Sequence, residues 1–192
     1  MPDSAQQQPG VVTGSLLWYT EAAAAFHQER PMSGTQRIPI GGILKSPGLS
    51  AIRVMGIPDR PGVASRIFRA LGRAGINVEL IAHSVDERGC SHITFCVERA
   101  RVEETLTLLE TYRQEVGFFE IKALREVALV SVFGPHFRER HGIAGAFFYA
   151  LAEAGINILA ISTSVSTCTC LISQFELDGA VRALEKVFQV PG

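Results

Sequence analysis

The sequence contains an internal repeat, and this repeat constrains the fold more than any other feature. Residues 62–71 return 80 residues later as residues 142–151, and the run Ala-Gly-Ile-Asn at 74–77 returns at 154–157. Before these blocks, equivalent residues of the two copies are 78 residues apart, and within them they are 80 residues apart. The first loop of the second copy is therefore expected to be two residues longer than that of the first copy. Two dense copies indicate duplicated domains, because a solenoid stacks about three or more units.

The first copy alternates between strand and helix patterns. A β-rich run ends at the turn residues 58–62, and apolar residues then recur at helical spacing until Gly75, which is typical of a left-handed helix cap. Asp59 is a candidate for capping the start of that helix. The predicted elements are a strand at 52–57, a helix at 63–74, strands at 77–84 and 90–97, a helix at 103–115 and a strand at 118–124. Their order is βαββαβ.

The second copy lacks the last of these elements. Its predicted elements are strands at 127–133, 157–164 and 167–173 and helices at 143–154 and 177–188. We expect the segment 37–44 to supply the missing fourth strand. The predicted organisation is a flexible leader at 1–36, an N-terminal strand completing the sheet at 37–50, a first domain at 51–125 and a second at 126–192. This is the α+β class, with antiparallel sheets that carry helices on one face.

Composition excludes several classes of partner. The formal net charge is −1 and no basic stripe occurs, which argues against nucleic acid or an anionic membrane as the main partner. No run approaches the roughly 20 apolar residues that span a bilayer. The chain has four cysteines and no secretory signal, so we expect a cytoplasmic protein with free thiols. No cofactor is expected, and no Gly-rich phosphate loop followed by Lys is present.

The loop between the first strand and first helix is the chemically distinctive part of each copy. Unpaired backbone N–H groups at a helix N-terminus suit a carboxylate, and Gly62 lets a ligand approach that backbone closely. The amide of Asn77 can donate and accept hydrogen bonds, and Asp59 or Glu79 can hold an ammonium group. Together they predict a site for a free amino acid. The plainer interpretation is that Asp59 only caps the helix and Gly62 only forms a turn.

Several segments resemble the tandem ACT domains of aspartate kinases. They are residues 54–62, 74–81 and 91–95 in the first copy and residues 152–158, 161–164 and 180–188 in the second. The resemblance covers about residues 38–190. It implies two ferredoxin-like ACT domains that form the regulatory portion, or a separate regulatory subunit, of an aspartate kinase responsive to lysine or threonine.

The resemblance also points to residues that would contact the effector between paired ACT domains. They are Asp59, Asn77, Val78, Glu79 and His83 in the first copy and Ile143, Ala144, Asn157, Ile158 and Ser164 in the second. The chain departs from the family pattern at several places, which include the loss of the usual Pro before Gly142 and the absence of the last strand. The family usually has Gln at the position of His83, and the segment 165–170 replaces a Glu-containing strand.

The implied partners are a free amino acid, lysine or threonine, and a catalytic subunit of aspartate kinase. Exposed sheet edges also favour a homodimer. No phosphotransfer is expected from this chain alone, because residues 1–36 are too few to form a kinase domain.

A second interpretation concerns thiols and imidazoles. Cys90 and His92 share one strand face, as do Cys168 and Cys170, and such side chains are ligands for softer metals. Their spacing differs from that of the usual metal loops, and a free cysteine is more often a small buried apolar residue. The alternative function is therefore a repurposed ACT protein that binds a metal or another small ligand through these strands.

Overall fold

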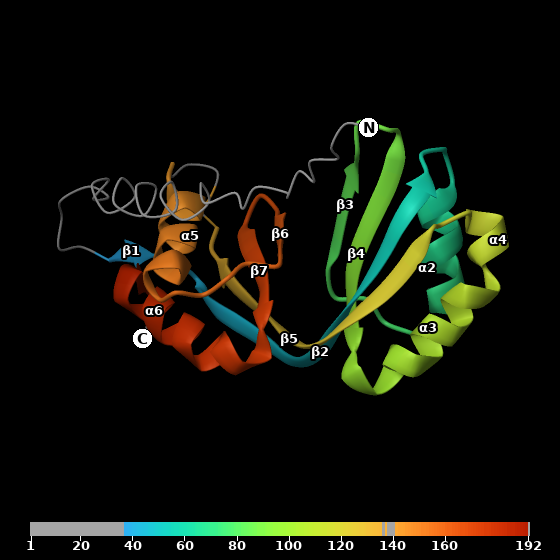
Figure 1. Ribbon diagram of the computed structural model, residues 1–192. Coiled ribbons are helices and arrows are strands. Elements are labelled where there is room, and N and C mark those ends of the chain that lie inside the picture. The colour runs from blue at the N-terminus through green and yellow to red at the C-terminus, as the bar shows by residue number, and fades with distance from the viewer. Residues whose placement is uncertain (1–36, 136, 138–140, 192) are drawn as a thin grey trace, which may run out of the picture. The chain divides into compact units, whose positions relative to one another are not determined.

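The fold is built on one sheet of six antiparallel strands in the order β3-β4-β2-β5-β7-β6 (Figure 1). The structure, a computed structural model, describes residues 37–135, 137 and 141–191, so the leader predicted at 1–36 lies outside the described residues. The strands are β1 Ile38–Pro39, β2 Gly42–Pro58, β3 Ile81–Val85, β4 Cys90–Glu98, β5 Glu120–Phe133, β6 Ala160–Thr163, β7 Thr167–Ser173 and β8 Phe188–Gln189. The helices are α2 Val63–Arg73, α3 Val102–Thr111, α4 Arg113–Val116, α5 Ile143–Glu153 and α6 Leu177–Val187, with short 3-10 turns η1 Arg99–Arg101 and η2 Gln174–Glu176.

Strands β2 and β5 run through both copies of the repeat. Residues 42–46 pair with 129–133, and residues 51–55 pair with 120–124. The first copy therefore uses β3, β4 and the later part of β2, whereas the second uses β7, β6 and the first part of β2. The strands predicted separately at 118–124 and 127–133 are one strand, because their connection pairs along β2 and makes no turn.

The two long strands bend where the copies meet. Their pairing shifts register between Ser46 and Ala51, and Glu126 has a left-handed φ of 57°. At this bend the side-chain Oε1 of Gln174 accepts hydrogen bonds from the Gly48 N–H (2.8 Å) and the Arg99 guanidinium (2.6 Å). Arg99 also lies 3.6 Å from the Glu126 carboxylate. The bend is thus held by side chains from both copies.

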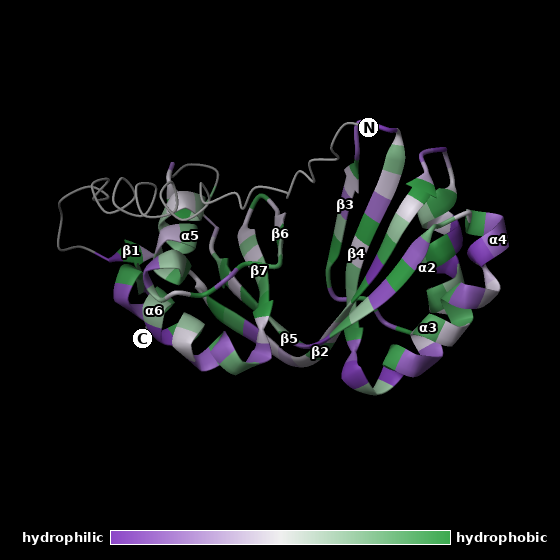
Figure 2. Ribbon diagram, viewed as in Figure 1, coloured by the Kyte–Doolittle hydropathy of each residue, from purple (hydrophilic) through white to green (hydrophobic). Residues whose placement is uncertain are grey.

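Each copy has its own apolar core between the sheet and its helices (Figure 2). Ile67 and Leu71 of α2 are buried in the first core, and Phe147 and Leu151 of α5 occupy the repeated positions in the second. A third cluster, which includes Leu49, Leu80 and Leu171, is separate from these two cores. The repeat therefore predicts correctly which helix faces are buried.

Helix boundaries follow from glycine conformations. Gly75 and Gly155 have φ of 67° and 70°, and each is followed by an N–H that bonds back to a helix carbonyl. The left-handed cap predicted at Gly75 is thus confirmed, and Gly155 repeats it. Gly62 with φ 95° is the N-cap of α2. The prediction that Asp59 caps this helix is wrong, because α2 has no side-chain cap hydrogen bond.

Two other predicted elements differ from the structure. The helix predicted at 103–115 divides at Tyr112 into α3 and α4. The strands predicted to begin at Asn77 and Asn157 begin only at Ile81 and Ala160. None of the helices in the described part of the chain is long and apolar enough to cross a membrane.

Candidate functional site

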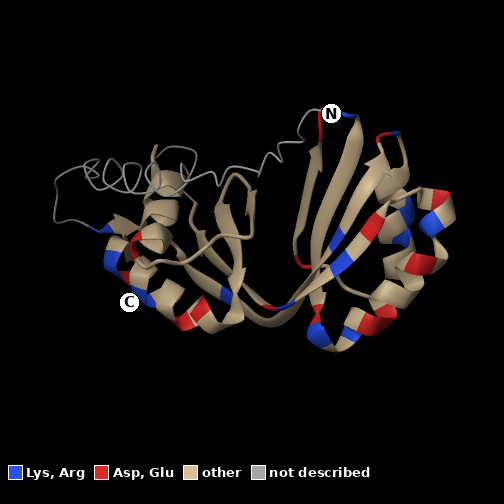
Figure 3. Cartoon of the chain, viewed as in Figure 1, with Lys and Arg blue, Asp and Glu red and all other residues tan. Residues whose placement is uncertain are grey.

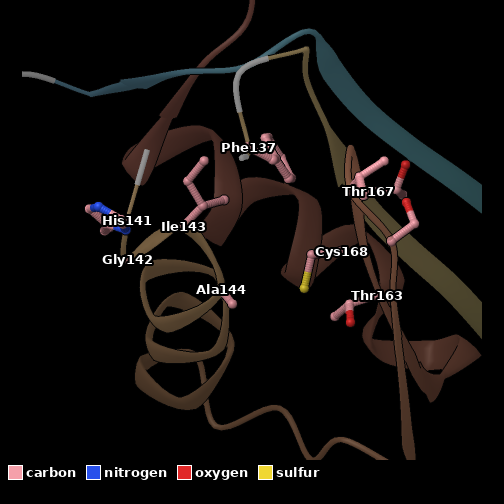
Figure 4. A pocket seen from close by; sticks show the side chains of 10 residues that line it. Phe137, His141, Gly142, Ile143, Ala144, Thr163, Thr167 and Cys168 are labelled. Carbon is pink, nitrogen blue, oxygen red and sulfur yellow. The ribbon is translucent and has the colours of Figure 1, made fainter. Parts of the chain in front are cut away.

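A pocket of about 350 Å³ lies at the N-terminus of α5, between that helix and the β6–β7 hairpin (Figure 4). Three residues proposed from the sequence, Ile143, Ala144 and Ser164, line it. The described lining consists of Phe137, His141, Gly142, Ile143, Ala144, Thr163, Ser164, Val165, Thr167 and Cys168.

The N-terminus of α5 lies beside this pocket, and no side chain caps it among the described residues. Gly142, with φ 87°, is the N-cap. The first intrahelical bond that reaches this end runs from the Ala146 N–H to the Gly142 carbonyl at 2.9 Å. The N–H groups ahead of Ala146 have no acceptor within the helix, and the helix end carries partial positive charge. This arrangement suits an anionic group such as a carboxylate.

The hairpin side of the pocket is polar but uncharged. The Ser164 N–H donates to the Thr167 carbonyl at 2.8 Å, which closes the β6–β7 turn. Thr163 and Cys168 face each other on β6 and β7 and line the pocket together (Figure 4). Burial raises the pKa of the Cys168 thiol, so the thiol stays neutral. Among the described lining residues there is no Asp, Glu, Lys or Arg, and Figure 3 shows few charges on α5, β6 and β7.

Asn157 and Ile158 lie away from the pocket residues. Asn157 is exposed in the loop that follows α5, whereas Gly142 precedes that helix. A helix of 11 residues is about 16 Å long, so the two ends of the predicted site are separated by the length of α5. Ile158 packs against the second core.

The first copy shows the same separation. Gly62 lies at the N-terminal end of α2, whereas Asn77, Val78 and Glu79 follow its C-terminal end. Asn77 and Glu79 are exposed, and the Glu79 N–H donates to the Cys96 carbonyl at 3.0 Å. Val78 packs against the first core.

The structure does bring Asp59 and His83 together, through a third residue. The Ser91 hydroxyl donates to the Asp59 carboxylate at 2.9 Å, and the His83 Nε2 lies 3.0 Å from the same hydroxyl. Ser91 is only 3% exposed. Sequence reasoning missed Ser91, and the only signal for it is strand alternation, which places this hydroxyl on the same sheet face as Ile93.

The cysteine and histidine residues do not assemble a metal site. Cys90 pairs with Pro58 at the end of β2, whereas Cys168 pairs with Val132 beside the start of β2. No cluster of three or more His, Cys, Asp or Glu that could hold a metal occurs among the described residues. Burial raises the pKa of Cys170 to about 12, which disfavours the thiolate that a metal needs.

His92 is also engaged within the fold. Its Nδ1 accepts from the Gly56 N–H at 3.4 Å, and its Nε2 lies 3.1 Å from the Asp86 carboxylate. The pKa of Asp86 is lowered, chiefly by the Cys90 N–H that its carboxylate accepts and then by His92. Both ring nitrogens of His92 therefore have partners.

Comparison with known proteins shows the family to which this chain belongs. The ACT-domain family matches residues 50–117 and again residues 130–188, so the chain belongs to the ACT-domain family and contains two such domains. These domains are homologous to the regulatory regions and regulatory subunits of aspartokinases.

The relatives support this assignment in sequence and in structure. An aspartokinase of Mycolicibacterium smegmatis is 36% identical over 143 residues, which cover 73% of this chain and 34% of the relative. A crystal structure of aspartokinase alpha and beta subunits contains a chain that is 34% identical, with 77% of this chain and 97% of that chain covered and a TM-score of 0.71. The regulatory subunit of aspartate kinase from Thermus thermophilus, in its ligand-free form, is 29% identical with coverages of 78% and 99% and a TM-score of 0.72. The chain thus spans about a third of its curated relative and nearly the whole of these two subunit chains.

Proposed function

We propose that this chain is an amino-acid-responsive regulator of the aspartokinase type, which senses threonine or lysine and controls a catalytic subunit made separately. The observation that carries the proposal is the pocket at the start of α5, where uncapped backbone N–H groups meet a hydroxyl-lined hairpin. An α-carboxylate would accept hydrogen bonds from those N–H groups. The proposal assigns no phosphotransfer activity to this chain alone.

The lining of the pocket favours threonine over lysine. Its described side chains carry no carboxylate that would pair with a second ammonium group, whereas Thr163, Ser164 and Thr167 offer hydroxyl groups. Burying an unpaired ammonium group is costly, so a neutral hydroxylated side chain is the better match. Sites of this kind are expected to reject analogues that leave their polar groups unpaired.

A homodimer is part of the proposal, because among the described residues each outer strand of the sheet pairs along one edge only. The outer strands are β3 and β6, and they expose Ile81 (47%), Val85 (49%) and Ile161 (45%). Val165, beside the pocket, is 64% exposed. A second chain placed along such an edge would cover apolar surface near the pocket and satisfy backbone groups. Asn77 and Asn157 of a second chain would then be available to complete the site.

Regulation would follow from differential affinity. An effector that binds one arrangement of the paired domains more tightly shifts the population toward that arrangement. The coupling between effector and catalytic subunit is reciprocal, so a catalytic subunit that prefers the effector-free arrangement would weaken effector binding by the same factor.

The test is thermal unfolding of the full chain with L-threonine, L-lysine and D-threonine. Saturation at about 100 times Kd adds about 2.7 kcal/mol of stability, which raises Tm by roughly 5–11 °C for a chain of this size. Ala144→Leu projects a larger side chain into the pocket and should abolish the response. Ala64→Leu places the same change at the repeated position of α2 and serves as the control. The absence of a Tm change with every amino acid, or equal loss in both variants, would refute the proposal.

A further inference from the structure

The two copies differ at the positions that surround the pocket. In the strand ladders, His83 lies opposite Ile93 in the first copy, and Thr163 lies opposite Cys168 at the repeated place in the second. Thr163 and Cys168 line the pocket, whereas their counterparts His83 and Ile93 are larger side chains. The first copy therefore has larger side chains at the two positions that line the pocket in the second copy.

The polar groups of the first copy are also already engaged. A hydroxyl has one hydrogen, and Ser91 gives it to the Asp59 carboxylate. The 3.0 Å contact between Ser91 and His83 must then be a donation from Nε2–H of the imidazole to the Ser91 oxygen. The three side chains form a directed chain from His83 through Ser91 to Asp59.

The backbone fixes this chain in place. The Asp59 N–H donates to the Gly89 carbonyl at 3.1 Å, which ties the loop after β2 to the hairpin between β3 and β4. Ser91 is 3% exposed, so water competes little for its hydroxyl. A ligand at this loop would have to break a partly buried set of hydrogen bonds before making its own.

We propose that His83, Ser91 and Asp59 lock the loop of the first copy, so that each chain has a single effector pocket, the one in the second copy. His83 stands where the second copy has the smaller Thr163, and it engages the Ser91 hydroxyl and, through Ser91, the Asp59 carboxylate. The inference rests on the proposed function for its ligand, but the lock itself is a property of the first copy alone.

The binding test is titration calorimetry of the full chain with L-threonine. We expect a stoichiometry of one threonine per chain, and we expect His83→Ala and Ser91→Ala to leave the affinity within about twofold of the wild type. Two threonines per wild-type chain, or a loss of affinity greater than about tenfold in either variant, would overturn the inference.

The lock is tested separately, without ligand, by a double-mutant cycle in thermal unfolding. His83→Ala and Ser91→Ala should each lower Tm, and the double variant should lower it by clearly less than the sum, because both single changes break the same hydrogen bond. Additive shifts would overturn the lock. If threonine fails to bind anywhere while the cycle shows coupling, the proposed function fails and the lock stands.

Discussion

Truncation of the Phe147 side chain should destabilise both copies together, although this residue lies in only one of the two cores. Phe147 lies on the buried face of α5 and is fully buried in the second core. Truncation of such a residue to Ala costs about 3–5 kcal/mol, from lost apolar burial and from the cavity that remains. For a chain of this size 1 kcal/mol lowers Tm by about 2–4 °C, so Phe147→Ala should lower Tm by about 6–20 °C.

The shared strands decide how this loss is distributed. β2 and β5 complete the sheets of both copies, so unfolding of the second core removes strand partners from the first. The assay is calorimetry combined with hydrogen exchange of peptides from α2 and α5. Ile67→Ala, at the repeated position in the first core, is the matched variant, with an expected cost of about 2–5 kcal/mol. Each variant should show one transition and raise exchange in both peptides. A Phe147→Ala protein in which α2 keeps its protection while α5 loses it would refute the reasoning.

Three further predictions concern the bend, a glycine in the left-handed conformation and a buried thiol. Gln174→Ala should lower the free energy of unfolding in urea by about 1–2 kcal/mol, because it removes the acceptor of two hydrogen bonds at the bend. The control, Gln189→Ala on β8, should lower it by a few tenths of a kcal/mol at most. Equal losses in the two variants would contradict the role assigned to Gln174. Gly56→Ala should lower the free energy of unfolding by about 2 kcal/mol or more, since φ is 66° and the new Cβ would lie 2.7 Å from the Phe119 Cβ. Gly72→Ala lies in the last turn of α2, where a new Cβ meets no atom within 4 Å, and should raise the free energy of unfolding by about 0.5–1 kcal/mol. The opposite order would contradict the backbone assignment. Burial raises the pKa of Cys96 to about 12 from its ordinary value near 9, so the neutral buried thiol contributes fully to stability below pH 9 and this contribution is lost as the pH rises toward 12. Cys96→Ala should therefore flatten the decline of Tm between about pH 9 and 11. An unchanged slope would exclude ionisation of Cys96 as a cause of that decline.

The repeat predicts the order of elements because apolar periodicity reports which residues face a core. The buried faces of α2 and α5 were predicted correctly for that reason, and the left-handed Gly75 was predicted from its place after the helix. The continuity of β2 and β5 was not predicted. Pro47 and Gly48 form a turn signal in the sequence, but cross-strand pairing over long sequence distances keeps the strand continuous there.

The candidate site was predicted in part for the same reason. Ile143, Ala144 and Ser164 converge because the loop before a helix and the second strand of the repeat meet at one end of the sheet. Asn157 was grouped with them by motif, yet it follows the helix that Gly142 precedes. Ser91 was missed because its hydrogen-bond partner Asp59 is 32 residues away, and sequence spacing holds no information on such contacts.

The continuity of the two long strands limits how the domains can move. Two backbones cross the bend side by side, so a rotation of one domain against the other must be absorbed by the few peptide units at Pro47–Gly48 and Arg125–Glu126. Any signal that depends on such a rotation would be recorded there as changed φ and ψ angles. Amide resonances of Gly48 and Glu126 would therefore report the state of the whole protein, wherever the ligand is bound.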